Sequence, residues 1–255
     1  MIKLKELEEY LAQFLNTASF NDYCVNGLQI EGKPEIHRII TGVSASARLF
    51  EKAVEYKADA VIVHHGLFWK YSPHPMRLTG TMRNRVKLLI SSDISLLGYH
   101  LPLDAHQELG NNALIAKALD LTNLSFRALS DFHQPISAVG ELKHSLTFDK
   151  FKEFADQALE TDGLALDFSK DTINRIYILS GGGGEYFNDA GDSGADIMVT
   201  GELKEQAVRA AEEMGLSLYG AGHYNSEKWG IHALGNHLME NFNLEVKFVD
   251  IPNPV

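Results

Sequence analysis

Short apolar runs alternate with segments of helical periodicity along this chain. The apolar runs are rich in branched residues, and several end in glycine or a polar turn residue. The runs cover residues 38–43, 60–63, 94–97, 175–179, 197–200, 216–219 and 246–250, and the helical segments cover 46–56, 82–91, 111–119, 151–159, 202–214 and 226–240. Such alternation predicts an α/β fold with mixed β-sheets flanked by helices.

One strand and its surroundings occur twice. Residues 58–63 (ADAVIV), which lead into His64-His65, align with residues 195–200 (ADIMVT), which lead into Gly201-Glu202. In each copy a glycine-bearing strand end and a helix precede this stretch, and a helix and a further strand with glycine and histidine follow it. We infer an internal duplication of a β-α-β-α-β unit, and therefore two lobes. The first lobe is expected to contain residues 1–125 and about 222–255, and the second residues 126–221.

The composition is that of an ordinary folded protein, with 45% apolar and 22% charged residues. A length of 255 residues allows one large domain or two of modest size. Lysine and arginine number 23 against 34 acidic residues, which gives a net charge of −11. A surface of this sign repels phosphate backbones and anionic lipids. The charge therefore argues against nucleic-acid partners, unless positive charge gathers locally or a metal supplies it.

The single cysteine and the N-terminal segment indicate a cytoplasmic protein. Cys24 cannot form a disulfide within the chain, and we interpret it as a buried apolar residue, the alternative being a reactive thiol. Residues 1–15 have the spacing of an amphipathic helix rather than the unbroken apolar core of a signal peptide. No apolar run reaches the roughly 18 residues that a membrane span needs, so no membrane association is expected.

Metal-capable side chains follow the predicted strands in three places. The first is His64-His65-Gly66, directly after the run 60–63. Consecutive residues of a strand point to opposite faces, so both rings serve one site only if the chain leaves the strand there, which Gly66 makes easy. A lone histidine near a strand is more often structural, but a pair at the carboxyl end of an α/β strand favours a ligand site.

The second place is the segment 99–106, where Asp104 lies between two apolar residues just beyond Pro102. An unpaired carboxylate there would be costly, which favours a bound cation, although Asp104 could instead cap a helical turn. The third place contains His223 and Glu227, four residues apart, with a helix start expected at 225 or 226 between them. Glu227 alone could simply complement the helix dipole, but beside His223 it is a second candidate ligand.

Together these places supply three imidazoles and two carboxylates. A structural zinc site needs four ligands and usually recruits thiolates, whereas this set of nitrogen and oxygen ligands suits two divalent ions bridged by a carboxylate. Imidazole with carboxylate fits Zn, Fe, Mn, Co or Ni better than Mg or Ca alone. Two such ions lower the pKa of a bound water, so the residues predict hydrolysis at a metal site between the lobes.

Several motifs resemble those of the NGG-interacting-factor-three-like family, whose short bacterial members, the YbgI-type proteins, are labelled GTP cyclohydrolase I type 2 homologues. The matching segments span essentially the whole chain and are 26–32, 64–66, 99–106, 201–202, 222–223 with Glu227, and 250–254. The resemblance implies a two-lobed α/β subunit, a dinuclear metal centre and a toroidal homohexamer built as a trimer of dimers. Carried onto this sequence, the metal ligands are His64, His65, Asp104, His223 and Glu227, with Glu227 as the bridge.

The first functional hypothesis is a metal-dependent hydrolase that acts on C–N bonds of a small molecule, with His100 as the candidate proton carrier. The family label suggests opening the imidazole ring of GTP, but no lysine or arginine cluster near the motifs would hold a triphosphate. Another nucleotide or a phosphoester fits the chemistry equally well. The alternative is a non-enzymatic protein, either a metal-responsive ring scaffold or a metal-handling protein. Nucleic acid threaded through a ring is disfavoured by the net charge.

Other candidate residues have ordinary explanations. Residues 181–184 are four glycines that could bind a phosphate but more often form a strand-to-helix turn. Glu202 has the repeat position of His65 and is therefore expected near the site. Phe68 and Trp69 could stack on a base, with core packing as the alternative. The histidines without any pattern are His37, His74, His133, His144, His232 and His237.

Overall fold

The computed structural model describes residues 1–70, 77–168 and 172–255, which form two compact units. Unit 1 contains Met1–Leu103 and Gly230–Pro252, and unit 2 contains Asp104–Trp229 and Asn253–Val255. These units differ from the expected lobes at residues 104–125, 222–229 and 253–255, which belong to unit 2. The physical reason is packing, because Ile115 and Leu119 are part of the core of unit 2. His74 lies outside the described residues.

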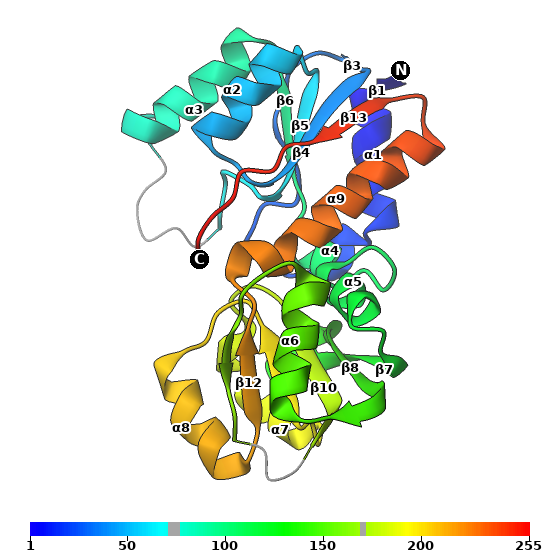
Figure 1. Ribbon diagram of the computed structural model, residues 1–255. Helices are drawn as coiled ribbons and strands as arrows, with labels where there is room; N and C mark the ends of the chain where they lie inside the picture. The colour runs from blue at the N-terminus through cyan, green and yellow to red at the C-terminus, as the bar shows by residue number, and fades with distance from the viewer. Residues whose placement is uncertain (71–76, 169–171) are drawn as a thin grey trace. The chain divides into compact units, whose positions relative to one another are not determined.

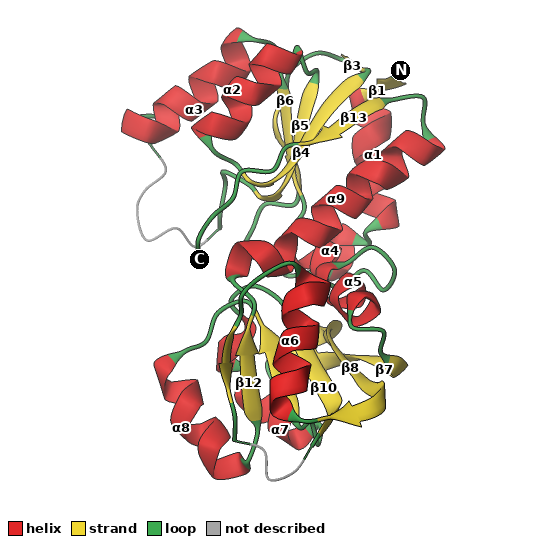
Figure 2. Cartoon of the chain, viewed as in Figure 1, coloured by secondary structure: helices red, strands yellow, loops and turns green. Residues whose placement is uncertain are grey.

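The main sheet of unit 1 has the strand order β13-β4-β5-β6-β2 (Figures 1 and 2). Its strands are β2 (Gly27–Ile30), β4 (Arg38–Ser44), β5 (Ala60–His65), β6 (Ser95–Gly98) and β13 (Glu245–Phe248). β13, β4, β5 and β6 are parallel, and β2 pairs antiparallel with β6. A short second sheet pairs β1 (Ile2–Lys3) with β3 (Glu35–Ile36). The central strands are continuous apolar runs because helices cover both faces of the sheet.

Helices cover this sheet in two pairs. α2 (Ala47–Tyr56) and α3 (Gly80–Ser91) lie side by side on one face, and α1 (Leu4–Phe14) and most of α9 (His223–Asn241) lie on the other (Figure 1). α2 begins where the Ser46 hydroxyl accepts a hydrogen bond from the Leu49 N–H at 3.3 Å. The turn η1 (Thr17–Ser19) follows α1, and the short α4 (Leu101–Asp104) ends at the boundary with unit 2.

The sheet of unit 2 has the strand order β7-β8-β10-β11-β12-β9. Its strands are β7 (Thr122–Leu129), β8 (Phe132–Leu146), β9 (Leu164–Leu166), β10 (Ile173–Leu179), β11 (Ile197–Thr200) and β12 (Ser217–Gly220). β10, β11 and β12 are parallel, whereas β8 and β9 run antiparallel to β10 and β12, and β7 forms a hairpin with β8. The strands β4-β5-β6-β2 of unit 1 and β10-β11-β12-β9 of unit 2 therefore have the same arrangement, three parallel strands followed by an antiparallel edge strand.

Unit 2 also has helices on its sheet. They are α5 (Asn111–Ala118), α6 (Phe148–Leu159), η2 (Gly183–Glu185), α7 (Phe187–Asp192) and α8 (Glu205–Met214), with the first turns of α9. Phe151 and Leu159 of α6 pack with Ile176 and Val199 of the sheet in the main core cluster. α7 and α8 contact each other and the strands β11 and β12.

The predicted α/β architecture with mixed sheets flanked by helices is confirmed. β11 has the bounds expected from the sequence, and the other predicted strands and helices lie within about three residues of theirs. The hairpin β7–β8 and the short strand β9 were not predicted. Cys24 is buried, as expected, and burial raises the pKa of its thiol to about 11.

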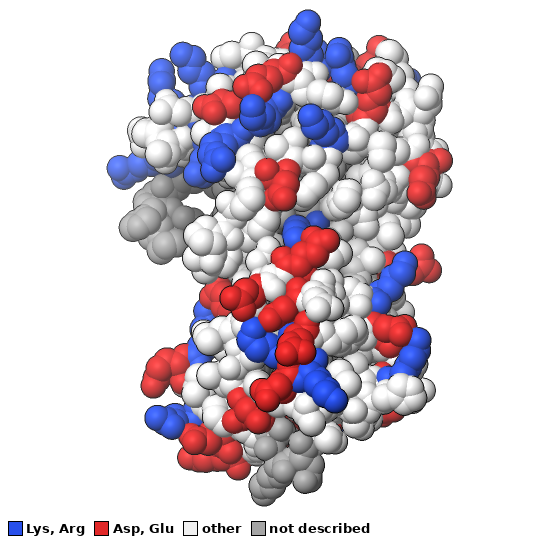
Figure 3. Space-filling view, in the orientation of Figure 1, with Lys and Arg blue, Asp and Glu red and all other residues white. Residues whose placement is uncertain are grey.

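Charge is unevenly distributed on the surface. Figure 3 shows Lys and Arg side chains gathered over α2 and α3 of unit 1, whereas acidic and basic side chains are interspersed over unit 2 on the same face. α3 carries Arg83, Arg85 and Lys87 and no acidic residue. Within the part of the chain that the structure describes, no helix combines the length and the hydropathy needed to cross a membrane.

Candidate metal centre

His64 and His65 are the last two residues of β5. From the sequence, both rings could serve one site only if the chain left the strand at this pair. The strand continues through His65, which pairs with Ser44 of β4. The two rings nevertheless lie close together, with centroids 4.7 Å apart. His64 is fully buried and His65 is half-buried. Gly66 then ends the strand, in contact with the side chain of Gln29.

Each imidazole of unit 1 near this strand end is held through its Nδ1 atom. His64 Nδ1 lies 3.0 Å from the carbonyl oxygen of Tyr99, and His65 Nδ1 lies 3.0 Å from Ser44 Oγ. His100 Nδ1 lies 3.0 Å from a carboxylate oxygen of Asp22. Histidines that bind metals characteristically donate their second ring N–H to such an oxygen, because the bond fixes the tautomer and the ring orientation. The arrangement therefore makes Nε2 the atom of each ring that could bind a metal.

His100 joins His64 and His65 in one cluster. One potential ligand atom from each of the three residues lies within 4.8 Å of the others. From the sequence, His100 was a candidate proton carrier beside the metal ligands. In the structure its ring nitrogens lie close enough to His64 and His65 for His100 to act either as a metal ligand or as a proton carrier.

Asp22 positions His100 and was missed by the sequence analysis. Its carboxylate is buried and also accepts hydrogen bonds from the Cys24 and Leu101 N–H groups and from Asn26 Nδ2, each at 2.9 Å. Burial raises the pKa of Asp22, but the hydrogen bonds, led by that from His100, outweigh burial and leave the pKa below its ordinary value. Asp22 is therefore an ionised anchor for the ring. No periodic pattern surrounds it in the sequence, so no signal marked it.

The motif at 26–32, which the sequence analysis used for family resemblance alone, also supports this cluster. Asn26 Oδ1 accepts a hydrogen bond from the His100 backbone N–H at 2.8 Å. Gln29 Oε1 accepts hydrogen bonds from the Leu67 and Phe68 N–H groups, so it holds the loop that follows His65. Trp69 lies on that loop, with its ring in edge contact with the His100 ring at 5.3 Å between centroids.

Asp104 is the last residue of α4 and is buried. It accepts a hydrogen bond from Asn111 Nδ2 at 2.7 Å and one from Ser180 Oγ at 3.3 Å. The alternative that Asp104 caps the start of a helical turn is wrong, because α4 ends rather than begins there. These two donors partly satisfy the buried carboxylate. Both donors are neutral, so they leave the negative charge of the carboxylate in place, and it can still bind a cation.

His223 and Glu227 lie on one face of α9. The helix begins at His223, earlier than the predicted start at 225 or 226, and this places the two side chains four residues apart on the same helix. His223 Nε2 is 3.0 Å from Glu227 Oε2, and His223 Nδ1 is 2.6 Å from Glu202 Oε1. Glu202 Oε2 in turn pairs with Lys204 Nζ at 2.7 Å. The expected place of Glu202 near the candidate ligands is thus observed within unit 2.

The two carboxylates determine the charge of His223. Burial lowers its pKa, but the bonds to Glu227 and Glu202 outweigh burial and raise the pKa to about 9. The ring is therefore protonated at neutral pH in the absence of a metal. A metal ligand must be neutral imidazole, so a divalent ion bound at Nε2 would displace that proton and take its place beside Glu227.

Gly181 leaves room for the Glu227 carboxylate. Its φ angle is +60°, and a Cβ atom at this position would overlap Glu227 Oε1. The Gly181 N–H donates to Ser226 Oγ at 2.9 Å, which ties the turn to α9. The glycine run at 181–184 leads from the end of β10 into η2. It therefore forms a strand-to-helix turn, which was the alternative to phosphate binding in the sequence analysis.

The structure thus groups the predicted site residues within each unit. His64, His65 and His100 lie together in unit 1, and His223, Glu227 and Glu202 lie together in unit 2, where Asp104 has its own partners Asn111 and Ser180. Buried clusters of His, Asp and Glu in this chain could bind metal ions. Their donor set of imidazole nitrogens and carboxylate oxygens fits Zn, Fe, Mn, Co or Ni.

Comparison with known proteins gives a consistent result. Residues 2–254 match the family model Duf34/NIF3 (NGG1p interacting factor 3). A protein of Yersinia pestis named GTP cyclohydrolase 1 type 2 homolog is 44% identical over 253 residues, which are 98% of each chain. The solved structure of protein ybgI, described as of unknown function, has a TM-score of 0.91 and 42% identity, with complete coverage of both chains. A structure from Thermus thermophilus has a TM-score of 0.88 and 32% identity, also with complete coverage.

Proposed function

This chain belongs to the Duf34/NIF3 (NGG1p interacting factor 3) family, and we propose on that premise that it is a metal-dependent hydrolase with two divalent ions per subunit. The resemblance read from the sequence motifs is thereby confirmed at the level of the family. The relatives carry the name GTP cyclohydrolase 1 type 2 homolog, so the proposed reaction is hydrolysis of a C–N bond in a nucleotide or related small molecule.

One observation supports the proposed metal site most strongly. In each of the four candidate histidines, Nδ1 lies within 3.0 Å of an oxygen atom, from Tyr99, Ser44, Asp22 and Glu202 respectively. This is the arrangement that metal-binding imidazoles require, and a chance set of structural histidines has no reason to share it. The ions would be held by His64, His65, Asp104, His223 and Glu227, with Glu227 as the bridge. Bound there, divalent ions would polarise the scissile bond and activate water.

The protein's own residues have separate roles in this proposal. Asp22 holds the His100 ring by Nδ1, which leaves Nε2 to carry a proton to or from the reacting group. Glu202 orients His223, and Gly181 gives Glu227 the space it occupies. We also propose that the two units arose by duplication, since β4-β5-β6-β2 of unit 1 and β10-β11-β12-β9 of unit 2 are each three parallel strands and an antiparallel edge strand in the same order. The proposed assembly is a toroidal homohexamer, a trimer of dimers.

Turnover and its loss test this function. Metal-replete protein is screened against GTP, other nucleotides, phosphoesters and cyclic amides, beside Glu227→Gln and the control Glu240→Gln, which changes an exposed residue of the same helix. We expect turnover in the wild type and in Glu240→Gln, and none in Glu227→Gln of unchanged oligomeric size. Activity that survives Glu227→Gln would reject the site as catalytic. Intact metal and assembly without turnover on any of these substrates would favour the scaffold or metal-handling alternative.

A further inference from the structure

Unit 2 contains a cavity beside Glu202. It has a volume of about 390 Å³ and lies where the chain leaves β11 and β12, between the segments 201–203 and 220–222 and the residues that precede β9. In open α/β sheets, ligands bind beyond the carboxyl ends of parallel strands, where the loops separate. A volume of this size is within the range of pockets that hold small molecules.

The polar side chains of this cavity have their donors engaged and offer hydrogen-bond acceptors. Asn225 uses its Nδ2 group for Thr161 Oγ1 at 3.1 Å and for the carbonyl of Ala221 at 3.3 Å. The Thr161 hydroxyl donates to the same carbonyl at 3.1 Å. The side-chain groups that can still bond to a ligand are the Oδ1 atom of Asn225 and the carboxylates of Glu202 and Asp162. All of these accept hydrogen bonds.

Cations near the cavity are already paired. Among the described residues that line it there is no lysine or arginine. Three cationic groups pair with the lining carboxylates: Lys204 and the protonated His223 with Glu202 at 2.7 and 2.6 Å, and Lys152 with Asp162 at 3.0 Å. A phosphate here would face two carboxylates and would have to break these ion pairs to gain a counter-charge. The remaining walls include the apolar side chains of Leu164, Leu203 and Pro254.

We infer that this cavity is the substrate pocket, and that it binds a neutral or cationic heterocycle with neighbouring N–H donors rather than a phosphate group. The inference rests on the proposed function, because Glu202 both lines the cavity and holds the ring of His223. The amino-imide edge of guanine, with one ring N–H beside an exocyclic amine, has the donor pattern that a carboxylate accepts in pairs. In a nucleotide ligand, the phosphates would then lie outside this cavity.

Calorimetric titration of the full chain with guanosine, inosine and GTP tests the inference. Inosine lacks the exocyclic amine and is otherwise matched to guanosine. We expect guanosine to bind roughly tenfold or more tightly than inosine, because a hydrogen bond to a charged group is lost. GTP is expected to bind no more tightly than guanosine. Each titration is made with chelator-treated protein and with metal-loaded protein, and the metal content of each sample is measured.

A variant that adds a positive charge to the wall of the cavity gives a second test. Leu164 is 62% exposed, so Leu164→Lys adds a cation to the cavity wall without disturbing the core. We expect this variant to shift the preference between guanosine and GTP toward GTP by roughly tenfold, because the added lysine can pair with one phosphate charge. Leu124→Lys makes the same change at an exposed position outside the cavity and should leave the preference unchanged.

Three results would overturn the inference: tighter binding of GTP than of guanosine, equal binding of guanosine and inosine, or no effect of Leu164→Lys. Absence of nucleoside binding to protein that has loaded its metals would overturn it as well, while leaving the proposed metal site intact. Guanosine binding to protein that cannot load metals would support the pocket and reject the proposed function instead.

Discussion

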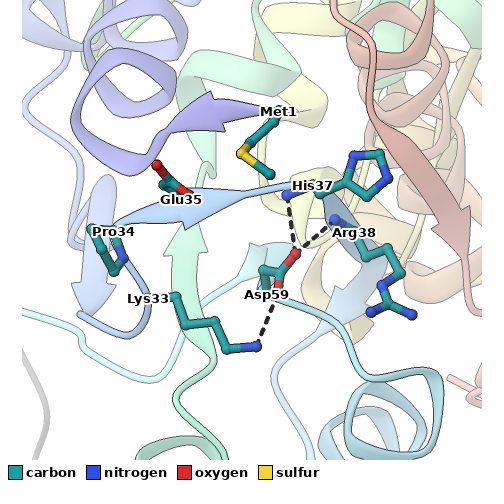
Figure 4. Close-up of a pocket in the computed structure, with 7 residues that line it drawn as sticks. All are labelled: Met1, Lys33, Pro34, Glu35, His37, Arg38 and Asp59. Carbon is teal, nitrogen blue, oxygen red and sulfur yellow. Dashed lines mark hydrogen bonds and ion pairs between the residues drawn. The ribbon is translucent and has the colours of Figure 1, made fainter.

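Asp59 and Asp196 hold their sheets in the same way. Each carboxylate accepts hydrogen bonds from two successive backbone N–H groups at the start of the neighbouring parallel strand. For Asp59 the donors are Arg38 at 2.9 Å and the residue before it at 3.0 Å (Figure 4), and for Asp196 they are Arg175 at 2.7 Å and the residue before it at 2.8 Å. These aspartates belong to the repeated AD dipeptides of the sequence, so the repeat has a structural purpose in both units.

Removal of either aspartate should destabilise its unit. Asp59 is buried, and Asp59→Ala leaves two backbone N–H groups at the half-buried start of β4 without their acceptor, so we expect the free energy of unfolding to fall by about 1–3 kcal/mol. Asp196→Ala should lower the free energy of unfolding by the same amount or less, because Asp196 is only half-buried. Urea denaturation followed by circular dichroism measures both. No loss of stability in Asp59→Ala would contradict the proposed purpose of the repeat.

The contribution of Asp59 should depend on pH. Burial raises the pKa of this carboxyl, but hydrogen bonds from Arg38, Lys33 and His37 outweigh burial and bring the pKa below its ordinary value. Because the folded pKa is depressed, the stabilisation is complete above the unfolded pKa of about 3.9 and is lost as the pH falls through the folded value. The stability difference between wild type and Asp59→Ala should thus be constant between about pH 5 and 7 and shrink below about pH 4. An equal difference across this whole range would contradict the prediction.

Gly181→Ala should impair metal binding through Glu227. The added methyl group overlaps Glu227 Oε1, so the carboxylate must move, and we expect a loss of metal affinity of roughly tenfold or more. Gly194→Ala is the matched control, because Gly194 also has a positive φ, of +71°, but a Cβ atom there meets nothing within 4 Å. Both variants carry similar backbone strain, which a thermal melt measures. Equal metal affinity in the two variants would show that Gly181 matters only for its backbone.

His100→Gln separates proton transfer from metal binding. If His100 carries a proton, the variant keeps its metals while turnover falls by roughly 10²–10⁴-fold. His144→Gln, at an exposed position, serves as the control and should change neither quantity. Metal analysis together with turnover on the substrate found in the screen gives the result. Loss of bound metal from His100→Gln would make His100 a ligand and contradict its assigned role.

The elements of the sheets could be predicted from the sequence because their residues are buried on both faces. The run IMVT at 197–200 is continuous and apolar for that reason, and its predicted bounds are those of β11. β8 (Phe132–Leu146) escaped prediction because only residues 136–140 and Leu142 are buried, while the residues toward both ends are partly or fully exposed and a proline lies near its start. Such a strand is specified by its partners β7 and β10 rather than by a local pattern.

The candidate ligands could be predicted in part from the sequence. The residues that hold them by hydrogen bonds could not. Histidine pairs and carboxylates at strand ends are visible in a sequence, so His64, His65, His223 and Glu227 were found. Asp22, Ser44 and Ser180 were not found, because single polar residues in loops and strand ends carry no spacing that marks them. They are recognised only when the fold brings them within hydrogen-bond distance of the site.

Metal content per chain decides whether the proposed pair of ions exists. Protein purified without added metal, and the same protein after incubation with divalent ions and removal of the excess, is measured by elemental analysis beside Glu227→Gln and Glu240→Gln. We expect about two ions per chain in the wild type and in Glu240→Gln, and at most one in Glu227→Gln, which lacks the proposed bridging carboxylate. A wild-type chain that loads no ion, or a Glu227→Gln chain with the full wild-type content, would contradict the account.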